Sequence, residues 1–409
     1  MPAHSDTSHP GRPRSPAAPL TGDAEILALY GSFCLFLSTI EFLIPKPLPF
    51  FRLGLANLPI LLALRTNKAG EDSAGKSSLR FILALVGLKI LGQALVNGTL
   101  FSYIFVFSTA GSLASGITMS ILSLVPARYL SLVGISVMGA LASNLVQILL
   151  ARYFLLGEGA WLIGPPFLAI GTVTGILLGA IAHSLSGTPL LSPFPRKPPS
   201  KSPEPDSDGS LPNVLPSFLI RNLSPGTLFL AGVTSLPPFL FSESLPTKGA
   251  LVLFYFLCAG WSGKRIRILP NLLAFLGIVA AHLVTPIGQV LFYLGRFPVT
   301  LGALRTGSLK ALTLLGMIAL SRFTLSTRVS FPGRLGAVLS RMFFYFERIT
   351  ERKIRLRRSH LWEDIRLLLQ EVYEEGLNPR PQAAGTRTTT RGYAFLLVFL
   401  LVSWSALLF

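Results

Sequence analysis

Long apolar runs recur along this sequence, and they constrain its fold more than any other feature. Several runs of about 17 to 25 residues contain almost no charged side chains, and a helix of that length crosses a hydrocarbon core of about 30 Å. Charged residues make up only 13% of the chain, whereas soluble domains carry roughly 25%. The sequence therefore predicts an all-α, polytopic membrane protein, which we expect in the cytoplasmic membrane.

A linker divides the predicted protein into two membrane domains. Residues 186–216 are dense in Pro and Ser and poor in large apolar side chains, which is typical of a linker. The domain before it, residues 25–185, has predicted spans at about 25–44, 48–64, 80–97, 99–124, 131–155 and 161–185. The domain after it, residues 217–409, has predicted spans near 217–241, 248–260, 268–295, 299–326 and 393–409, and Pro286 is a candidate break in the third of these.

The distribution of basic residues predicts that the N-terminus is cytoplasmic. Residues 1–24 are polar and Pro-rich and lack the apolar region of a cleavable signal, so we expect a disordered tail. Cytoplasmic loops carry an excess of Lys and Arg. With the N-terminus inside, the inside loops of the first half hold Arg65, Lys68, Lys76, Arg80, Arg128, Arg196, Lys197 and Lys201. This bias accounts for the net charge of +18, and since no nucleic-acid-binding pattern accompanies it, we predict no nucleic-acid partner.

One short stretch, GEDSAGKS at Gly70–Ser77, fits the phosphate-binding loop pattern G-x-x-x-x-G-K-[ST]. A working loop of this kind follows a buried strand and begins a helix. Here a predicted membrane span precedes it, and Glu71 and Asp72 would place carboxylates against phosphates. We therefore interpret the stretch as a solvated cytoplasmic turn. If ATP drives this protein, another chain hydrolyses it.

Polar residues four apart lie within the third predicted span. Lys89, Gln93 and Asn97 share one helical face. A Lys at the centre of a membrane helix costs roughly 2.5 to 3.5 kcal/mol on insertion scales, so its presence needs a reason. One interpretation is a polar pocket wall that faces an anionic or polar ligand. The other is a structural ion pair with Glu41, and the two are compatible.

Two further polar groups extend the candidate pocket. Asn144 and Gln147 are spaced i, i+3 in the fifth predicted span and either line the same cavity or form an interhelical hydrogen bond. Arg52 and Asn57 lie in the second predicted span. Arg52 is near the outer end of that span, where its side chain either joins the pocket or extends to the interface.

Small residues at helical spacing predict close helix contacts. Ala24, Ala28 and Ser32 are four apart on the first span, and we expect this face to dock a partner subunit. A second set, Gly171, Gly175 and Gly179, has the same spacing on the sixth span. We expect that set to pack inside the domain.

A basic amphipathic segment occupies about residues 328–376 of the second half. Its cluster of Arg355, Arg357 and Arg358 precedes Trp362 and a helical apolar stripe. Such a helix either lies in the cytoplasmic interface against anionic lipid or fits a groove on a partner protein.

Several kinds of chemistry have no motif in this sequence. There is no D-D-x-x-D spacing for a magnesium diphosphate site and no Cys/His cluster for a metal. Cys34 and Cys258 each lie within an apolar run and have no partner at metal spacing. We therefore predict no catalytic residue, no metal and no cofactor.

Three stretches of the first half resemble a known family: EFLIPKPLPFFRLGLANLPILLAL, LKILGQALVNGTLFSYIFVFSTAG and GISVMGALASNLVQILLARY. They are similar to the Gx transporter family, also called heptaprenyl diphosphate synthase component I. That family resembles the six-helix, substrate-binding S components of energy-coupling-factor (ECF) importers. The resemblance implies a membrane-embedded small-molecule binder in which Asn57, Asn144 and Gln147 match motif positions. Ser143 stands where the family has His, and Lys89 where it usually has Arg.

The second half resembles the T component of the same importers more faintly, best at GRFPVTLGALRTGSLKALTLLGMIALSRFTLST. In T components, Ala-Arg-Gly motifs dock into ATPase subunits, and this chain has Glu375 where that arginine is expected. The main hypothesis is a fused S-like and T-like subunit of an ECF-type transporter, with ATP hydrolysis in separate chains. The alternatives are a membrane accessory subunit of heptaprenyl diphosphate synthase in quinone biosynthesis, or a scaffold of a flavin or redox assembly.

Overall fold

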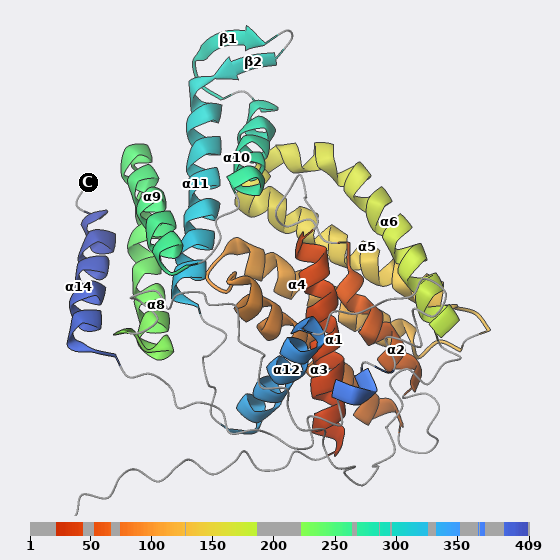
Figure 1. Ribbon diagram of the computed structural model, residues 1–409. Coiled ribbons are helices and arrows are strands. Elements are labelled where there is room, and N and C mark those ends of the chain that lie inside the picture. Colours follow the sequence, from red (N-terminus) through yellow and green to blue (C-terminus); the bar gives the residue numbers. More distant parts are fainter. Residues whose placement is uncertain are drawn as a thin grey trace, which may run out of the picture.

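The protein is a helical assembly, seen here as a computed structural model (Figure 1). The structure describes residues 22–43, 53–66, 74–126, 128–185, 222–263, 268–285, 287–294, 297–325, 333–351, 367, 369–372 and 388–407. The helices of the first half are α1 Gly22–Leu43, α2 Leu58–Thr66, α3 Ala74–Asn97, α4 Tyr103–Leu122, α5 Leu132–Ala151 and α6 Ala160–Leu185. A 3-10 turn, η1 Leu55–Asn57, precedes α2, and a π turn and a 3-10 turn, η2 Arg152–Leu156 and η3 Gly157–Gly159, join α5 to α6.

The second half contains helices and one small sheet. Its helices are α8 Pro225–Phe241, α9 Leu245–Trp261, α10 Ile268–Leu283, α11 Leu301–Thr324, α12 Gly333–Glu351 and α14 Thr390–Ser405. Between α10 and α11, strands β1 Val290–Leu294 and β2 Phe297–Thr300 form an antiparallel hairpin.

Length and composition confirm the predicted membrane class. Stretches long and apolar enough to cross a bilayer are Asp23–Phe42, Leu79–Asn97, Tyr103–Leu122, Leu132–Leu185 and Leu301–Thr324. The stretch Leu132–Leu185 contains both α5 and α6. Shorter apolar helices are Leu55–Leu64, Pro225–Phe241, Leu245–Trp261, Ile268–Leu283 and Thr390–Ser405. The fold is thus an all-α polytopic membrane protein, and its described residues include a β-hairpin.

The structure differs from the predicted spans at two places. Where a span over 48–64 is predicted, α2 has only 9 residues, about 14 Å of helix, which is too short to cross a bilayer. Gly54, with φ of 81°, interrupts the helix there, because a left-handed residue ends helical geometry. The predicted span 268–295 ends as a helix at Leu283, and its last residues enter β1.

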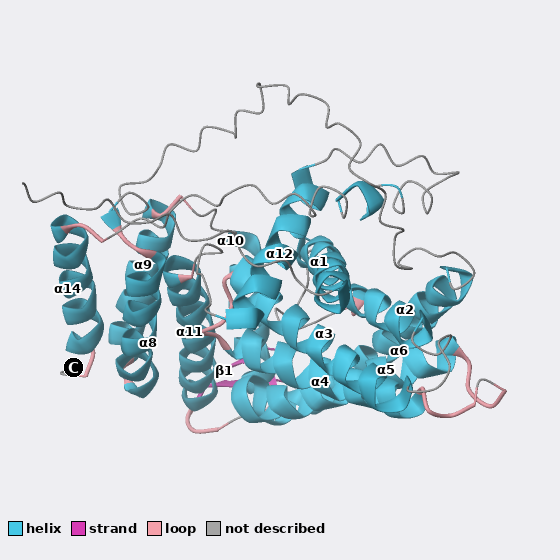
Figure 2. Ribbon diagram, turned by 90° about the horizontal axis from the view of Figure 1, so that it is seen from below, coloured by secondary structure: helices cyan, strands magenta, loops and turns pink. Residues whose placement is uncertain are grey.

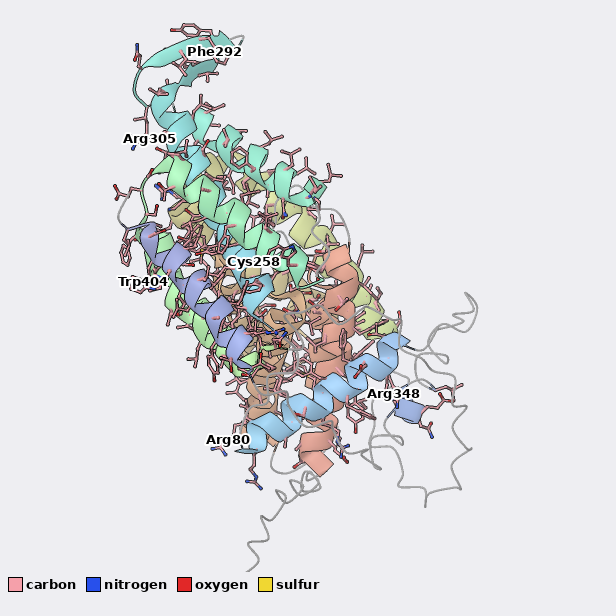
Figure 3. The ribbon with its side chains drawn as sticks, turned by 60° about the vertical axis from the view of Figure 1, so that its left-hand side comes forward. Arg80, Cys258, Phe292, Arg305, Arg348 and Trp404 are labelled. Carbon is pink, nitrogen blue, oxygen red and sulfur yellow. The ribbon has the colours of Figure 1, made fainter. Side chains whose placement is uncertain are left out.

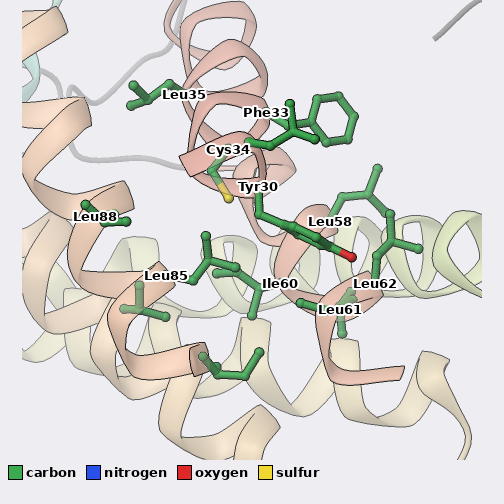
Figure 4. Packing of buried hydrophobic residues seen from close by; sticks show 14 of the residues in the cluster. Tyr30, Phe33, Cys34, Leu35, Leu58, Ile60, Leu61, Leu62, Leu85 and Leu88 are labelled. Carbon is green, nitrogen blue, oxygen red and sulfur yellow. The ribbon is translucent and has the colours of Figure 1, made fainter. Parts of the chain in front are cut away.

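Helices from the two halves pack against each other. Helix α12 packs along α1, and it contributes Val338, Leu339, Met342, Tyr345 and Ile349 to the same buried cluster as α1, α2 and α3. Figure 4 shows the part of this cluster around Tyr30, Cys34, Leu61 and Leu85. A second cluster joins α4 and α5 to α10 and α11. In Figures 1 and 2, α5 and α6 run across the direction of α8, α11 and α14, so the halves are not one parallel bundle.

Several predicted features lie partly or wholly outside the described residues. Residues 1–21 of the predicted tail and the whole linker 186–216 are outside, and so are Arg52, Arg355, Arg357, Arg358, Trp362 and Glu375. In the phosphate-loop-like stretch, Gly70–Ser73 are outside, whereas Ala74–Ser77 form the start of α3. The described element before this stretch is helix α2, not the strand that a phosphate-binding loop follows.

A candidate ligand cavity in the first half

A buried polar cavity lies between α1, α3, α4, α5, α6 and the turn before α2. Its volume is about 30 Å³, which is room for about one water molecule. Its polar lining consists of Glu41, Asn57, Lys89, Gln93, Ser108, Ser112, Ser136, Ser143, Asn144, Gln147 and Thr174. Its other lining residues include Gly54, Met119, Gly171, Gly175 and Leu178. Polar side chains from several helices therefore gather around one cavity, whose remaining lining is apolar.

Glu41 holds the turn that forms one wall of the cavity. Its carboxylate accepts hydrogen bonds from the backbone N–H of Leu53 at 2.7 Å and of Leu55 at 3.1 Å. The left-handed Gly54 between them lets both N–H groups point at one carboxylate. Because the chain is fixed there, Asn57 of η1 faces α3, and its Oδ1 accepts a hydrogen bond of 2.5 Å from Lys89 Nζ.

The α3 wall carries the predicted polar face. Lys89 is 4% exposed and Gln93 is 2% exposed, so both point to the protein interior. Ser108 Oγ, on α4, donates to Gln93 Oε1 at 3.4 Å. Asn97, the last residue of α3, is half-buried and does not line the cavity. The third residue of the predicted face thus lies apart from the other two.

The α5 wall is set by glycines on its two neighbours. Asn144 Nδ2 donates to the Phe167 carbonyl of α6 at 3.0 Å, and a Cβ on Gly171 would collide with that amide nitrogen. Gln147 Nε2 donates to Ser143 Oγ at 2.8 Å. A Cβ on Gly111 of α4 would lie 2.5 Å from Nε2 of Gln147. The glycines therefore leave the space that both amides occupy.

One acceptor in this wall has no protein partner. Gln147 is 2% exposed, and its Oε1 has no hydrogen-bond partner among the described residues. An unpaired buried polar group costs about 1–3 kcal/mol. The same residue lines the cavity, so a donor placed in the cavity would remove that cost.

The charges of the lining balance. Among the described residues, Lys89 and Glu41 are the ionisable side chains that line the cavity, and their formal charges cancel. The described residues contain no group of three or more His, Cys, Asp or Glu that could hold a metal. The described lining therefore offers hydrogen bonding by the Lys89 ammonium, the Glu41 carboxylate, amides and hydroxyls.

The cavity brings together most of the pocket residues that the sequence singles out. Glu41, Asn57, Lys89, Gln93, Asn144 and Gln147 all line it. The sequence did not indicate that Ser108, Ser112, Ser136 and Thr174 line the cavity, and it indicated Ser143 only as a departure from the family motif. Isolated hydroxyl residues are common in membrane helices, where they bond to their own backbone, as Thr174 does to the Gly171 carbonyl. The spacing of four between Ser108 and Ser112 was the available signal.

The predicted docking face of α1 lies against the same chain. Ala28 and Ser32 are fully buried and Ala24 is partly buried. Gly31 of the same helix lies against Met342 of α12. The glycines of α6 pack inside the domain, as expected from their spacing. Gly175 lies against the backbone of Val137 on α5, and Gly179 lies against that of Val133.

A second buried lysine, in the second half of the chain, lies outside this cavity, and the sequence did not single it out. Lys248 of α9 is 5% exposed. It donates to Thr313 Oγ1 of α11 at 3.1 Å and lies 5.6 Å from the centre of the Phe239 ring. These contacts satisfy part of its hydrogen-bonding and charge requirement within the helix packing.

Comparisons with known proteins relate each half to a different family. Residues 227–327 match the model of a domain of unknown function (DUF8519). No curated protein matches the chain, and no solved structure matches it. Residues 30–185, which contain the cavity, match the model of the family described as heptaprenyl diphosphate synthase component I, as the motifs of the first half predicted.

Proposed function

We propose that the chain is a non-catalytic membrane subunit that works with a separate prenyl diphosphate synthase subunit. The observation that supports this is the match of residues 30–185 to component I of heptaprenyl diphosphate synthase. Synthesis of a prenyl chain needs acidic residues that hold magnesium diphosphate, and the sequence has no such motif. The catalytic residues would then belong to the partner, and this chain would hold the partner at the membrane that receives the product.

The cavity has the chemistry of a small polar ligand rather than of the prenyl substrate. A prenyl diphosphate carries several negative charges and a long apolar chain. The cavity offers Lys89 as its cation, balanced by Glu41, and a volume of about 30 Å³. A charge without a partner is expensive to bury. We expect the ligand to be neutral or singly anionic, to hydrogen-bond to Gln147 Oε1, and to require the cavity to widen.

Co-purification tests the proposed partner. The tagged full chain is isolated in mild detergent from cells that make it natively, and the proteins that elute with it are identified by mass spectrometry. The proposal predicts a soluble prenyltransferase among them, and prenyl product formed faster by the complex than by that enzyme alone. A preparation that contains no prenyltransferase, and whose addition leaves product formation unchanged, would contradict it.

Matched variants test the cavity within the same experiment. Gln147→Leu removes an amide from the cavity wall, whereas Leu145→Ala changes an exposed residue of the same helix. If ligand binding in the cavity regulates the complex, only Gln147→Leu changes product formation. If both variants are equally active, the proposed partner still stands, but a regulatory role for the cavity is contradicted.

A second candidate function is a subunit of an ECF-type transporter. Two observations favour it: the buried polar cavity in the half that resembles an S component, and the packing of α12 from the second half along α1. In this case ATP-binding subunits co-purify, and vesicles take up a small molecule when ATP is supplied. Uptake by vesicles that contain Lys89→Leu and Asn144→Leu would count against the cavity as the transport site.

A further inference from the structure

The β1–β2 hairpin is an apolar ribbon at one end of the molecule. Phe292 pairs with Val299 and Tyr293 pairs with Pro298. The ribbon lies across the ends of α10 and α11 and is the outermost described element there (Figures 1 and 3). It is far from the first-half cavity in sequence and belongs to the part of the chain matched by a domain of unknown function.

Both faces of the ribbon expose apolar side chains. Phe292 is 55% exposed and Tyr293 is 69% exposed, and Val290, Leu291 and Ile287 are also exposed. Successive residues of a strand point to opposite faces, so β1 exposes apolar side chains on both of its faces, whereas Val299 and Thr300 of β2 are buried. An isolated two-stranded ribbon is at best marginally stable in water, and apolar exposure of this kind indicates a binding surface.

The base of the ribbon is held firmly on the helices. Leu301 N–H donates to the Gln289 carbonyl at 2.9 Å, and Ile287 N–H donates to Thr300 Oγ1 at 3.2 Å. Thr300 and Val299 are buried. A Cβ on Gly302 would collide with the Ile287 carbonyl. The ribbon is therefore fixed at a defined height above α11.

The length of α11 is consistent with a ribbon at the headgroup layer of a membrane. Helix α11 has 24 residues, about 36 Å, which exceeds a hydrocarbon core of about 30 Å. Arg305 is exposed one turn below the start of α11, next to the ribbon in Figure 3. An exposed arginine on a membrane helix extends toward the lipid headgroups. The ribbon lies beyond that level and across the helix ends.

Exposed apolar side chains also occur on α10 and between its end and the ribbon. Leu272, Leu276, Val284 and Ile287 are all exposed, and they lead along α10 to β1. On an apolar helix of a membrane protein such a face contacts lipid. Tyr and Trp are favoured at the boundary between acyl chains and headgroups. The described residues of 287–300 carry no charge, and the sequence between the two strands contains Arg296, a residue type that reaches lipid headgroups.

We propose that the β1–β2 hairpin is a membrane-interface anchor, which lies flat in the headgroup layer and contacts lipid with Phe292 and Tyr293. A protein partner fits the observations less well, because it would cover one face of the ribbon and leave the other exposed to water. Lipid surrounds both faces at once. The anchor would fix the depth and tilt of α10 and α11 in the bilayer.

Site-specific fluorescence tests this proposal in the full chain. Phe292→Cys and Tyr293→Cys place a thiol on each face of the ribbon, and Glu347→Cys on the exposed side of α12 is the control. The native Cys34 and Cys258 are buried, so the unaltered chain shows whether a polarity-sensitive maleimide dye labels only the new thiol. Equal melting temperatures in detergent establish that the variants fold. Each labelled protein is reconstituted into vesicles of phosphatidylcholine and phosphatidylglycerol.

The proposal predicts a blue-shifted emission at both ribbon positions. Lipid that carries a quencher on its headgroup should quench this emission more strongly than lipid that carries it at the chain end. Emission at both positions that aqueous iodide quenches and lipid quenchers do not would overturn the proposal. Emission shielded from iodide and from both lipids would also overturn it, because it indicates a protein contact.

Discussion

Arg341 of α12 forms an ion pair with Glu25 of α1, with 3.1 Å between Nη2 and Oε1. The two residues are 316 positions apart, and their side chains are only 13% and 7% exposed. Next to the pair, Met342 fills a notch formed by Gly31 and Gly92. The first helix of the chain therefore completes its packing with a helix of the second half.

Removing one member of this pair should destabilise the protein. Arg341→Met leaves the Glu25 carboxylate buried beside an apolar side chain, and breaking a buried pair costs about 3–5 kcal/mol. We expect a lower melting temperature in detergent and easier proteolysis of α12. The double variant Glu25→Gln with Arg341→Met should lose less than the sum of the single variants. Strictly additive losses would contradict direct pairing.

Enlarging Gly92 should push α12 away from α3. A Cβ at Gly92 would lie 2.7 Å from Met342 Cε and 2.8 Å from Leu35 Cδ2, and overpacking of this kind costs about 1–3 kcal/mol. Gly87→Ala on the same helix is the control, because nothing lies within 4 Å of its Cβ. Thermal unfolding should separate the two variants. If both melt alike, α12 does not pack there.

Gly171→Ala should disturb the cavity. The new methyl group would displace the Asn144 amide from the Phe167 carbonyl, and leaving a buried polar group unpaired costs about 1–3 kcal/mol. Gly164→Ala is the control on the same helix, because its nearest neighbour is Ile148 at 3.9 Å. Thermal unfolding is the measurement, and Asn144→Ala in combination with Gly171→Ala should lose less than the sum of the single variants, because the smaller side chain makes room for the new methyl group. A Gly171→Ala protein as stable as Gly164→Ala would show that the amide is not held there.

Lys89 and Lys248 provide a comparison of two buried lysines. Lys89 lines the cavity, whereas Lys248 lies among α8, α9 and α11. A thermal-shift screen of small neutral and singly anionic molecules should find stabilising ligands of the unaltered chain. We expect Lys89→Met to abolish the ligand-induced shift and Lys248→Met to retain it. A shift that survives Lys89→Met would exclude the ammonium from the binding site.

The sequence predicts the polar residues of the site well and their partners poorly. A buried polar side chain is costly in any membrane helix, whatever packs against that helix. The sequence therefore already singles out Lys89, Gln93, Asn144 and Gln147 by residue type and spacing. Asn97 shares the spacing of Lys89 and Gln93 and still lies outside the cavity, because a helical face continues past the end of a pocket. Glu41 accepts hydrogen bonds from Leu53 and Leu55 because the chain turns at Gly54. The apolar composition of residues 48–64 predicts a continuous span there and gives no sign of this turn.

The amino-acid sequence is enough to identify a helical membrane protein with polar groups buried in its first half, because apolar length and the cost of buried polarity are properties of single segments. The three-dimensional arrangement is needed to show that α12 covers α1, that residues from α1, α3, α4, α5 and α6 share one cavity, and that the predicted span 268–295 ends in a hairpin. Those features depend on complementary shapes between distant segments, such as Met342 against Gly31 and Gly92. The small residues of a helix show that another segment can pack closely there, but they do not show which segment it is.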